Sequence, residues 1–180
     1  MVYAKRNFQD VSDMAHRGTY FKSSPAAAFE AAFEKIYRQK MRELPITRPH
    51  LAVRALGFAP FHGHWIGALV TPWSILVVLA SGNEQTWPAV QVGKIMPVRL
   101  PAGAFHFLGM QEESLGEFLA CSLMSPIEPV YRQKDCEAFA AKALALMMTP
   151  AAEASKPSGA ASTELTRRDF FAPRPDKEMR

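Results

Sequence analysis

The sequence is poor in cysteine, and nowhere does charge of one sign accumulate. Cys121 and Cys136 are the only cysteines among 180 residues. This excludes a disulfide framework, a zinc knuckle and a CxxC redox pair within one chain. Two unpaired thiols are typical of a protein of the reducing cytosol. With 48% apolar and 21% charged residues, the composition is that of an ordinary globular domain, which excludes a coiled coil or a disordered protein.

The net charge of +4 is spread along the chain. Residues 1–24 contribute +2, residues 25–148 contribute +1 and residues 149–180 contribute +1. Nucleic-acid binding requires a basic stripe that neutralises phosphates, and acids and bases alternate here instead. We therefore expect no nucleic-acid partner.

Charge is absent from Ala55 to Asn83, a stretch long enough to cross a membrane as a helix. Pro60, Gly63 and Pro72 divide it into pieces of about ten residues. These pieces are rich in Val, Ile, Trp and Phe, which favours strands. We interpret the stretch as the buried sheet of a soluble domain and expect no integral membrane segment. The N-terminus has no cationic start followed by an apolar run, so we expect no secretory signal.

The order of the predicted elements indicates an α+β fold. Ser24 and Pro25 are typical of a helix start, and the apolar stripe that follows runs to about Arg42. Strand-like patterns then occupy residues 51–58, 65–70, 74–79, 94–100 and 104–108. Helical spacing returns at 114–125 and at 135–148. We predict a two-layer sandwich, in which an antiparallel sheet of about five strands has helices on one face.

The ends of the chain differ in composition from its middle. Residues 1–24 are polar and aperiodic, which predicts a mobile N-terminal arm. Residues 25–148 predict a single domain. Residues 149–180 are rich in Ala, Ser, Pro, Gly and Glu, so we expect a disordered C-terminal tail that buries too little apolar surface to fold.

His62 and His64 are the most metal-like pair in the sequence. On an extended strand their two imidazoles point the same way, as two ligands of one metal do. A metal site needs three or four ligands, however, and no cysteine or acidic residue lies near them in the sequence. We therefore expect histidines at a hairpin turn and no bound metal.

Residues for catalysis are few. Cys121, with or without His106, is a candidate thiol nucleophile. Ser122 and Ser125 lack the Gly-x-Ser-x-Gly setting of a nucleophilic serine, and no phosphate-binding glycine loop is present. The sequence predicts a protein that is not an enzyme and has no cofactor. A small thiol-dependent enzyme or redox protein that uses Cys121 is the alternative.

Two short segments combine features of a core with features of a contact surface. LVTPW, residues 69–73, sets a strand against a proline and a large aromatic residue. CSLMSP, residues 121–126, ends a predicted helix with small polar residues, a leucine, a methionine and a proline. Core and turn are the first interpretation of each segment, and a partner-binding patch is the second. The candidate partner-binding residues of the domain are Trp65, Pro72, Trp73, Cys121, Ser122, Leu123, Ser125 and Pro126.

Three segments together resemble the HybE/HupJ family of nickel–iron hydrogenase assembly chaperones: ALGFAPFHGHWIGALVTPWSILVVL, RLPAGAFHFLG and LGEFLACSLMSP. The resemblance covers roughly residues 28–148, with the segments in the order and at the spacing of the family. Where the family usually continues VTPW into Phe-Met-Asn, this chain has Ser74, Ile75 and Leu76. The resemblance implies a non-catalytic cytoplasmic accessory protein with the two-layer α+β fold of secretion chaperones.

The resemblance also implies the partners. The main one is the precursor of a hydrogenase subunit, held until its metal clusters are installed and before the folded enzyme is exported. The small subunit, which carries a twin-arginine signal, is favoured, and the large subunit is the alternative. Other hydrogenase accessory proteins are further implied partners. An apolar segment of the client would be buried against a sheet or groove edged by Trp65, Trp73 and the corner from Leu123 to Pro126.

TRRDFF, residues 166–171, is similar to the consensus of twin-arginine export signals. No apolar stretch follows it, so we do not expect an export address. A short capped helix with a basic start is one interpretation. The other is that Arg167, Arg168 and Phe170 or Phe171 occupy the surface that recognises a client's signal.

Overall fold

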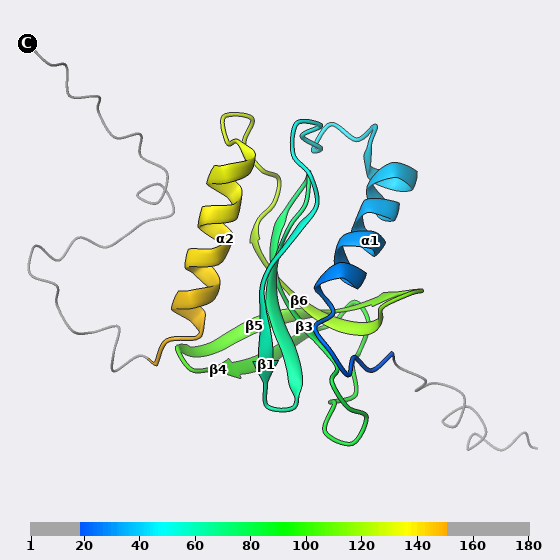
Figure 1. Cartoon of the computed structure of the whole chain (residues 1–180), viewed down its shortest axis with the longest axis vertical. Coiled ribbons are helices and arrows are strands. Elements are labelled where there is room, and N and C mark those ends of the chain that lie inside the picture. The colour runs from blue at the N-terminus through cyan, green and yellow to red at the C-terminus, as the bar shows by residue number, and fades with distance from the viewer. Residues whose placement is uncertain (1–18, 151–180) are drawn as a thin grey trace, which may run out of the picture.

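A computed structural model describes residues 19–150, so the predictions for residues 1–18 and 151–180 lie outside the described residues. The strands form one antiparallel sheet with the order β1-β2-β3-β6-β5-β4 (Figure 1). The α+β class and the antiparallel sheet are confirmed, with six strands where about five were predicted. In chain order the elements are α1 (Ala26–Ile36), the π-helical turn η1 (Tyr37–Met41), β1 (Arg54–Phe61), β2 (His64–Val70), β3 (Ile75–Ala80), β4 (Ile95–Leu100), β5 (Gly103–Glu112), β6 (Gly116–Met124) and α2 (Gln133–Met147).

The two helices cover opposite faces of this sheet (Figure 1). Along β3, Ile75, Val77 and Leu79 pack in a cluster with α2, whereas Val78 and Ala80 pack in a cluster with α1. Because neighbouring residues of a strand point to opposite faces, α1 and α2 lie on different sides. The prediction of helices on one face is therefore wrong. A central strand that is apolar on both faces needs a cover on each.

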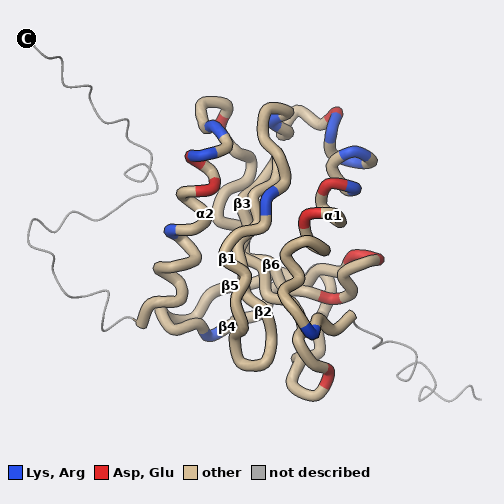
Figure 2. Tube along the Cα trace, in the orientation of Figure 1, with Lys and Arg blue, Asp and Glu red and all other residues tan. Residues whose placement is uncertain are grey.

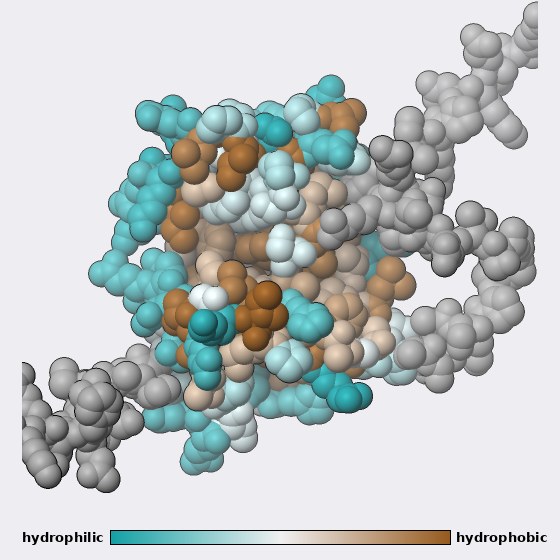
Figure 3. All heavy atoms as spheres, turned by 180° about the vertical axis from the view of Figure 1, so that it is seen from behind, coloured by the Kyte–Doolittle hydropathy of each residue, from teal (hydrophilic) through white to brown (hydrophobic). Residues whose placement is uncertain are grey.

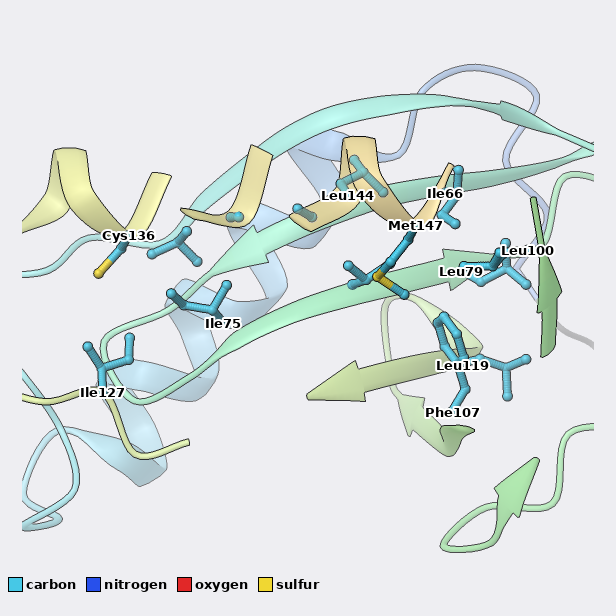
Figure 4. Packing of buried hydrophobic residues seen from close by; sticks show 14 of the residues in the cluster. Ile66, Ile75, Leu79, Leu100, Phe107, Leu119, Ile127, Cys136, Leu144 and Met147 are labelled. Atoms are coloured by element: carbon cyan, nitrogen blue, oxygen red, sulfur yellow. The ribbon is translucent and has the colours of Figure 1, made fainter. Parts of the chain in front are cut away.

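The core on the α2 side is mainly aliphatic. Figure 4 shows α2 lying across β2 and β3, with Leu144 and Met147 directed at the sheet. Ile66, Leu79 and Leu119 of three neighbouring strands belong to the same cluster and are almost fully buried. This core fixes α2 against the sheet, and its helical spacing is the one that the sequence predicted.

The core on the α1 side is aromatic. Phe29 is fully buried, and its ring lies 5.3 Å from that of Phe118, 5.5 Å from that of Phe58 and 6.2 Å from that of Phe33. Rings at these separations and tilts attract one another in addition to the surface that they bury. The stripe predicted for this helix therefore packs as expected and fixes α1 across β2, β3 and β6.

Residues 114–124 correct the prediction of a helix. They form the turn after β5 and the strand β6, which begins at Gly116 with a φ of 68°. Because β6 lies between β3 and β5 and is apolar on both faces, its sequence has no strand-like alternation. The spacing of Leu115, Phe118 and Leu119 then resembles that of a helix. The segment CSLMSP thus ends a central strand.

The folded part begins before the predicted boundary at residue 25. Phe21 donates its N–H to the carbonyl of Ser81 at 2.9 Å. Its own carbonyl accepts a hydrogen bond from Nε1 of Trp65 at 2.8 Å. The last residues of the predicted arm are therefore attached to the sheet.

Charged residues lie mainly on the helices and loops, where acids and bases are intermingled (Figure 2). The stretch without charge from Ala55 to Asn83 forms most of β1 together with β2 and β3, as predicted. Within residues 19–150, no helix is both long enough and apolar enough to cross a bilayer.

Candidate partner-binding surface

The two motifs singled out in the sequence meet at one end of the sheet. Ile75, the first residue of β3, pairs with Met124, the last residue of β6. In an antiparallel pair, the turn that precedes one strand lies beside the segment that follows the other. We call residues 71–74 and 124–126 together the Trp73 corner.

A hydroxyl group organises the turn at this corner. Thr71 donates its N–H to the carbonyl of Ser74 at 2.8 Å, and its Oγ1 accepts the N–H of Ser74 at 2.9 Å. The turn directs the ring of Trp73 onto α1 and η1, where it stacks with Phe33 at 6.2 Å and with Tyr37 at 6.4 Å. Trp73 is half-buried by these contacts, which supports its interpretation as a core residue.

Arg48, which sequence reasoning missed, links the two motifs. Its N–H donates to the carbonyl of Pro72 at 2.7 Å, and its Nε donates to the carbonyl of Ile127 at 2.7 Å. A guanidinium donor makes the second bond a strong one. Ile127 lies 79 positions further along the chain, so nothing near Arg48 in the sequence indicates this role.

Apolar side chains are exposed on the loops around the Trp73 corner. Leu44 and Ile46, in the loop after η1, are 43% and 39% exposed, and Val130, in the loop before α2, is 71% exposed. A hydrogen bond of 2.9 Å between Nε2 of His50 and the carbonyl of Tyr131 joins the two loops. This end of the molecule therefore presents an apolar rim.

Beyond α1, no helix within residues 19–150 covers this side of the sheet. Ile95 of β4 pairs with Leu108 of β5, which pairs in turn with Ala120 of β6. Since Ala120 packs in the α1 cluster, all three lie on the α1 side. Ile95 is 69% exposed, and Figure 3 shows apolar surface in the middle of the rear of the molecule with hydrophilic residues around it. The open sheet face, as we call it, consists of the exposed residues Ile95, Pro97, His106, Leu108 and Ser122.

Ser122 joins the open sheet face to the Trp73 corner, because it pairs with Leu76, early in β3. Its neighbours Cys121 and Leu123 pack against the α2 cluster on the other side of the sheet. Pro72 is buried. The predicted residues that lie exposed or half-buried near this junction are Trp73, Ser122, Ser125 and Pro126.

Trp65 lies at the opposite end of β2 and does not edge a groove with Trp73. It pairs with Ala80, whereas the turn follows Val70 at the far end of the same strand. Five residues of strand separate Trp65 from Val70, which is about 17 Å. Helix α1 packs on the sheet between the two tryptophans. The prediction that Trp65 and Trp73 edge one groove is wrong. The sequence does not specify which strand ends α1 covers, so it could not separate the two tryptophans.

The thiol of Cys121 lacks the setting of a nucleophile. It is half-buried, and burial raises its pKa, whereas activation requires a lowered pKa. His106 cannot assist it, because His106 shares the α1 side with Leu108 and Cys121 shares the α2 side with Leu119. Burial, together with Asp135 and Glu137, raises the pKa of Cys136 to about 11.

The histidine pair belongs to the β1–β2 hairpin, as the sequence predicted. His62 is exposed in the turn, whereas His64 is only 7% exposed. Nδ1 of His64 accepts the N–H of Gly82 at 3.2 Å, and its Nε2 lies 3.2 Å from the carbonyl of Thr86. Within residues 19–150, no three His, Cys, Asp or Glu side chains lie close enough together to hold a metal ion.

His64 makes stability depend on pH. Burial is the main cause that lowers its pKa below the ordinary histidine value, so the folded state takes up this proton less readily than the unfolded state. The contribution of neutral His64 to the free energy of unfolding is therefore fully present above about pH 6.5 and decreases as the pH drops below that value. We expect His64→Gln to reduce the decrease of melting temperature between pH 7.5 and pH 5. The exposed neighbour provides the control: the charge of His62 lowers the pKa of His64 less than burial does, so His62→Gln should keep most of the decrease, and identical profiles for both variants would contradict the assignment.

Comparison with known proteins identifies the family. The profile described as NiFe-hydrogenase assembly, chaperone, HybE matches residues 24–173. This chain belongs to the HybE family. The match begins at the start of α1 and includes both motifs of the Trp73 corner as well as TRRDFF. The resemblance seen in the sequence is therefore confirmed.

Individual members of the HybE family have similar sequences. The hydrogenase-2 operon protein HybE of Escherichia coli (strain K12) is 36% identical over 107 residues, which are 59% of this chain and 66% of that protein. The hydrogenase expression/formation protein HupJ of Bradyrhizobium diazoefficiens is 36% identical over 143 residues, which are 78% of this chain and 82% of that protein. The matched region thus spans slightly less than two thirds of the first relative and more of the second.

A solved member of the family has the same fold. The solution structure of HybE from Escherichia coli matches this structure with a TM-score of 0.60 and 29% sequence identity. The match covers 83% of this chain and 94% of that one. The α+β fold with an open antiparallel sheet and two helices is therefore shared with HybE.

Proposed function

We propose that this chain is a cytoplasmic, non-catalytic chaperone that binds the precursor of a nickel–iron hydrogenase subunit during maturation, before export. Membership of the HybE family and the names of its relatives support this function. The observation that carries the mechanism is the open sheet face, on which Ile95 is 69% and Leu108 is 38% exposed. Exposed apolar surface beside a covered core is typical of a protein interaction site.

The client packs against the face of the sheet and not along its edge. β4 is the edge strand beside the open sheet face, and an extended client segment on this side of the molecule would have to pair with it to add a strand. Pro97 lies in the middle of β4 and has no N–H to donate, which interrupts such pairing. Client side chains buried between Ile95, Leu108 and the Trp73 corner contribute more affinity than strand addition along β4 would.

Two glutamates at the far end of β5 favour a client with paired arginines. Glu112 lies four residues beyond Leu108 on the same side of β5, about 13 Å away. Burial alone would raise its pKa, but hydrogen bonds from Ser114 and Leu115 outweigh that effect and lower it, so Glu112 is ionised at neutral pH. Glu113, whose side chain is 85% exposed, lies beside it in the turn.

A twin-arginine segment matches this arrangement. Its arginines would pair with Glu112 and Glu113, and the apolar residues that follow would reach Leu108 and Ile95. We therefore favour the small-subunit precursor as the client, since that subunit carries the twin-arginine signal. The large-subunit precursor, which lacks such a segment, is the alternative.

One substitution and its control test this function. Ile95→Glu places a charge on the open sheet face, and Leu146→Glu places the same charge on α2, where Leu146 is 46% exposed. We expect capture of the small-subunit precursor to fall at least tenfold with Ile95→Glu and to be unchanged with Leu146→Glu, because only the first buries a charge under the client. Both side chains are exposed, so both melting temperatures should stay close to that of the parent protein. Full capture by Ile95→Glu, or an equal loss with both variants, would contradict the proposal.

A further inference from the structure

We infer that the segment TRRDFF, residues 166–171 of this chain, docks on the open sheet face of the same molecule and competes there with the client. The competition rests on the proposed function, but the docking itself does not. The evidence is the place where the described chain ends, the length of sequence that follows, and the match in charge and apolarity between the segment and this face.

The chain leaves the described part next to the strands of the open sheet face. Met147, the last residue of α2, accepts the N–H of Ala102 at 3.1 Å, which joins this end of the helix to the turn between β4 and β5 (Figure 1). Thr149 then bonds back to the carbonyl of Ala145 at 2.8 Å. The C-terminal segment therefore starts at the turn between the two strands that carry Ile95 and Leu108, but on the α2 side of the sheet, and it must pass the edge strand β4 to reach the open sheet face.

The sequence between the end of the described part and TRRDFF is long enough for the segment to reach the open sheet face. Sixteen residues, 151–166, separate Pro150 from Arg167. Fully extended they reach about 55 Å, and a chain of Gly/Ser-type composition spans about 20–24 Å on average. From Gly103 to Glu112 along β5 is about 30 Å. The whole open sheet face, including its acidic end, lies within this reach.

The segment and the surface are complementary. Arg167 and Arg168 match Glu112 and Glu113 in charge. Glu112 is the last residue of β5, and Glu113 follows it in the turn. Phe170 and Phe171 follow after Asp169, and docking would direct them past Met110, which packs against the α1 cluster, to Leu108 and Ile95. The only base near the acidic turn that forms an ion pair among the described residues is Lys35, which lies 3.3 Å from Glu113 at the surface.

Tethering makes a weak contact effective. A segment attached through a linker of this length acts at a local concentration in the millimolar range. A client with the same pattern of two arginines and an apolar pair must displace it. We expect the tail to weaken client binding about tenfold, so that only a segment with additional apolar contacts, such as a longer signal, binds well.

Crosslinking in the full-length protein tests the docking without any client. p-Benzoyl-phenylalanine in place of Phe170 should crosslink within the same chain to the peptide that contains residues 92–112, whereas the same group in place of Met179 should not. Arg167→Glu with Arg168→Glu should abolish this crosslink, and Arg174→Glu, in the same tail, should leave it unchanged. Absence of the crosslink would overturn the inference. Crosslinks that form only between two chains and increase with concentration would overturn it too, because the occupant would be a second copy.

A titration then tests the competition. A fluorescent synthetic peptide with a twin-arginine signal should bind the Arg167→Glu/Arg168→Glu protein about tenfold more tightly than the parent or the Arg174→Glu protein. The difference should shrink at high salt, because arginine contacts at a surface are screened. Equal or weaker binding by the double variant would overturn the competition. An intramolecular crosslink together with no peptide binding by any variant would support the docking and count against the proposed client.

Discussion

Trp73→Ala should destabilise the protein by about 3 kcal/mol, the lower end of the range for truncating a packed tryptophan. The ring is half-buried and stacks on Phe33 and Tyr37, so its removal leaves a cavity between the turn and helix α1. For a protein of this size, the loss corresponds to a melting temperature lower by about 10 °C. Thermal melting followed by circular dichroism measures it, and Trp73→Phe should recover most of the loss.

The same variant separates two roles of Trp73. A core residue lowers the melting temperature when truncated, whereas a pure contact residue lowers client capture and leaves melting unchanged. The stacking on α1 favours the first role. An unchanged melting curve together with lost capture would show that Trp73 belongs to the contact surface alone.

Gly109→Ala should cost about 3 kcal/mol and disturb β4, because backbone occupies the space that a side chain needs. A Cβ at Gly109 would overlap the carbonyl oxygen of Gln91. Gly109 also exchanges two hydrogen bonds with the segment before β4: it donates to the carbonyl of Lys94 and accepts from Gly93, both at 2.8 Å. A shift of this segment displaces Ile95 and therefore the open sheet face.

Gly67→Ala is the matched control for this effect. Gly67 also lies within a strand, but a Cβ there would overlap the ring of Phe58, a half-buried side chain that can give way at the cost of its contact with Phe29, whereas the backbone of Gln91 cannot. We expect a clearly smaller loss of stability than for Gly109→Ala. Urea denaturation measures both, and equal losses would show that the contact with Gln91 does not determine the cost.

The sequence predicts the two helices and five of the strands and fails for β6. The aromatic stripe of α1 and the hairpin of β1 and β2 follow from spacing and turn residues, and both are confirmed. β6 was predicted as a helix, since an interior strand between two cores has no polar face. Each helix packs its apolar stripe against one face of the sheet. The periodicity of the stripe does not specify which face, so the sequence could not place the helices on opposite faces.

The candidate site shows the same limit. Trp73 and the segment from Ser122 to Pro126 were predicted as core and turn residues first and as a partner-binding patch second, and the register of β3 and β6 brings them together. Trp65 was grouped with them, although it lies at the other end of β2. Ile95 and Leu108 were missed, because an exposed apolar residue in a strand looks like a core residue until the coverage by α1 is known. Family membership, by contrast, could be predicted from the motifs alone.

Site-specific photocrosslinking with a hydrogenase small-subunit precursor tests the central claim most directly. p-Benzoyl-phenylalanine would replace Leu108 on the open sheet face in one protein and Leu146 on α2 in the other, two exposed leucines on opposite sides of the sheet. We predict a crosslink to the precursor from position 108, mapped to its twin-arginine segment, and none from position 146. A crosslink from position 146 alone, or none from either position while the precursor is still captured, would contradict the assignment of the open sheet face as the client-binding surface.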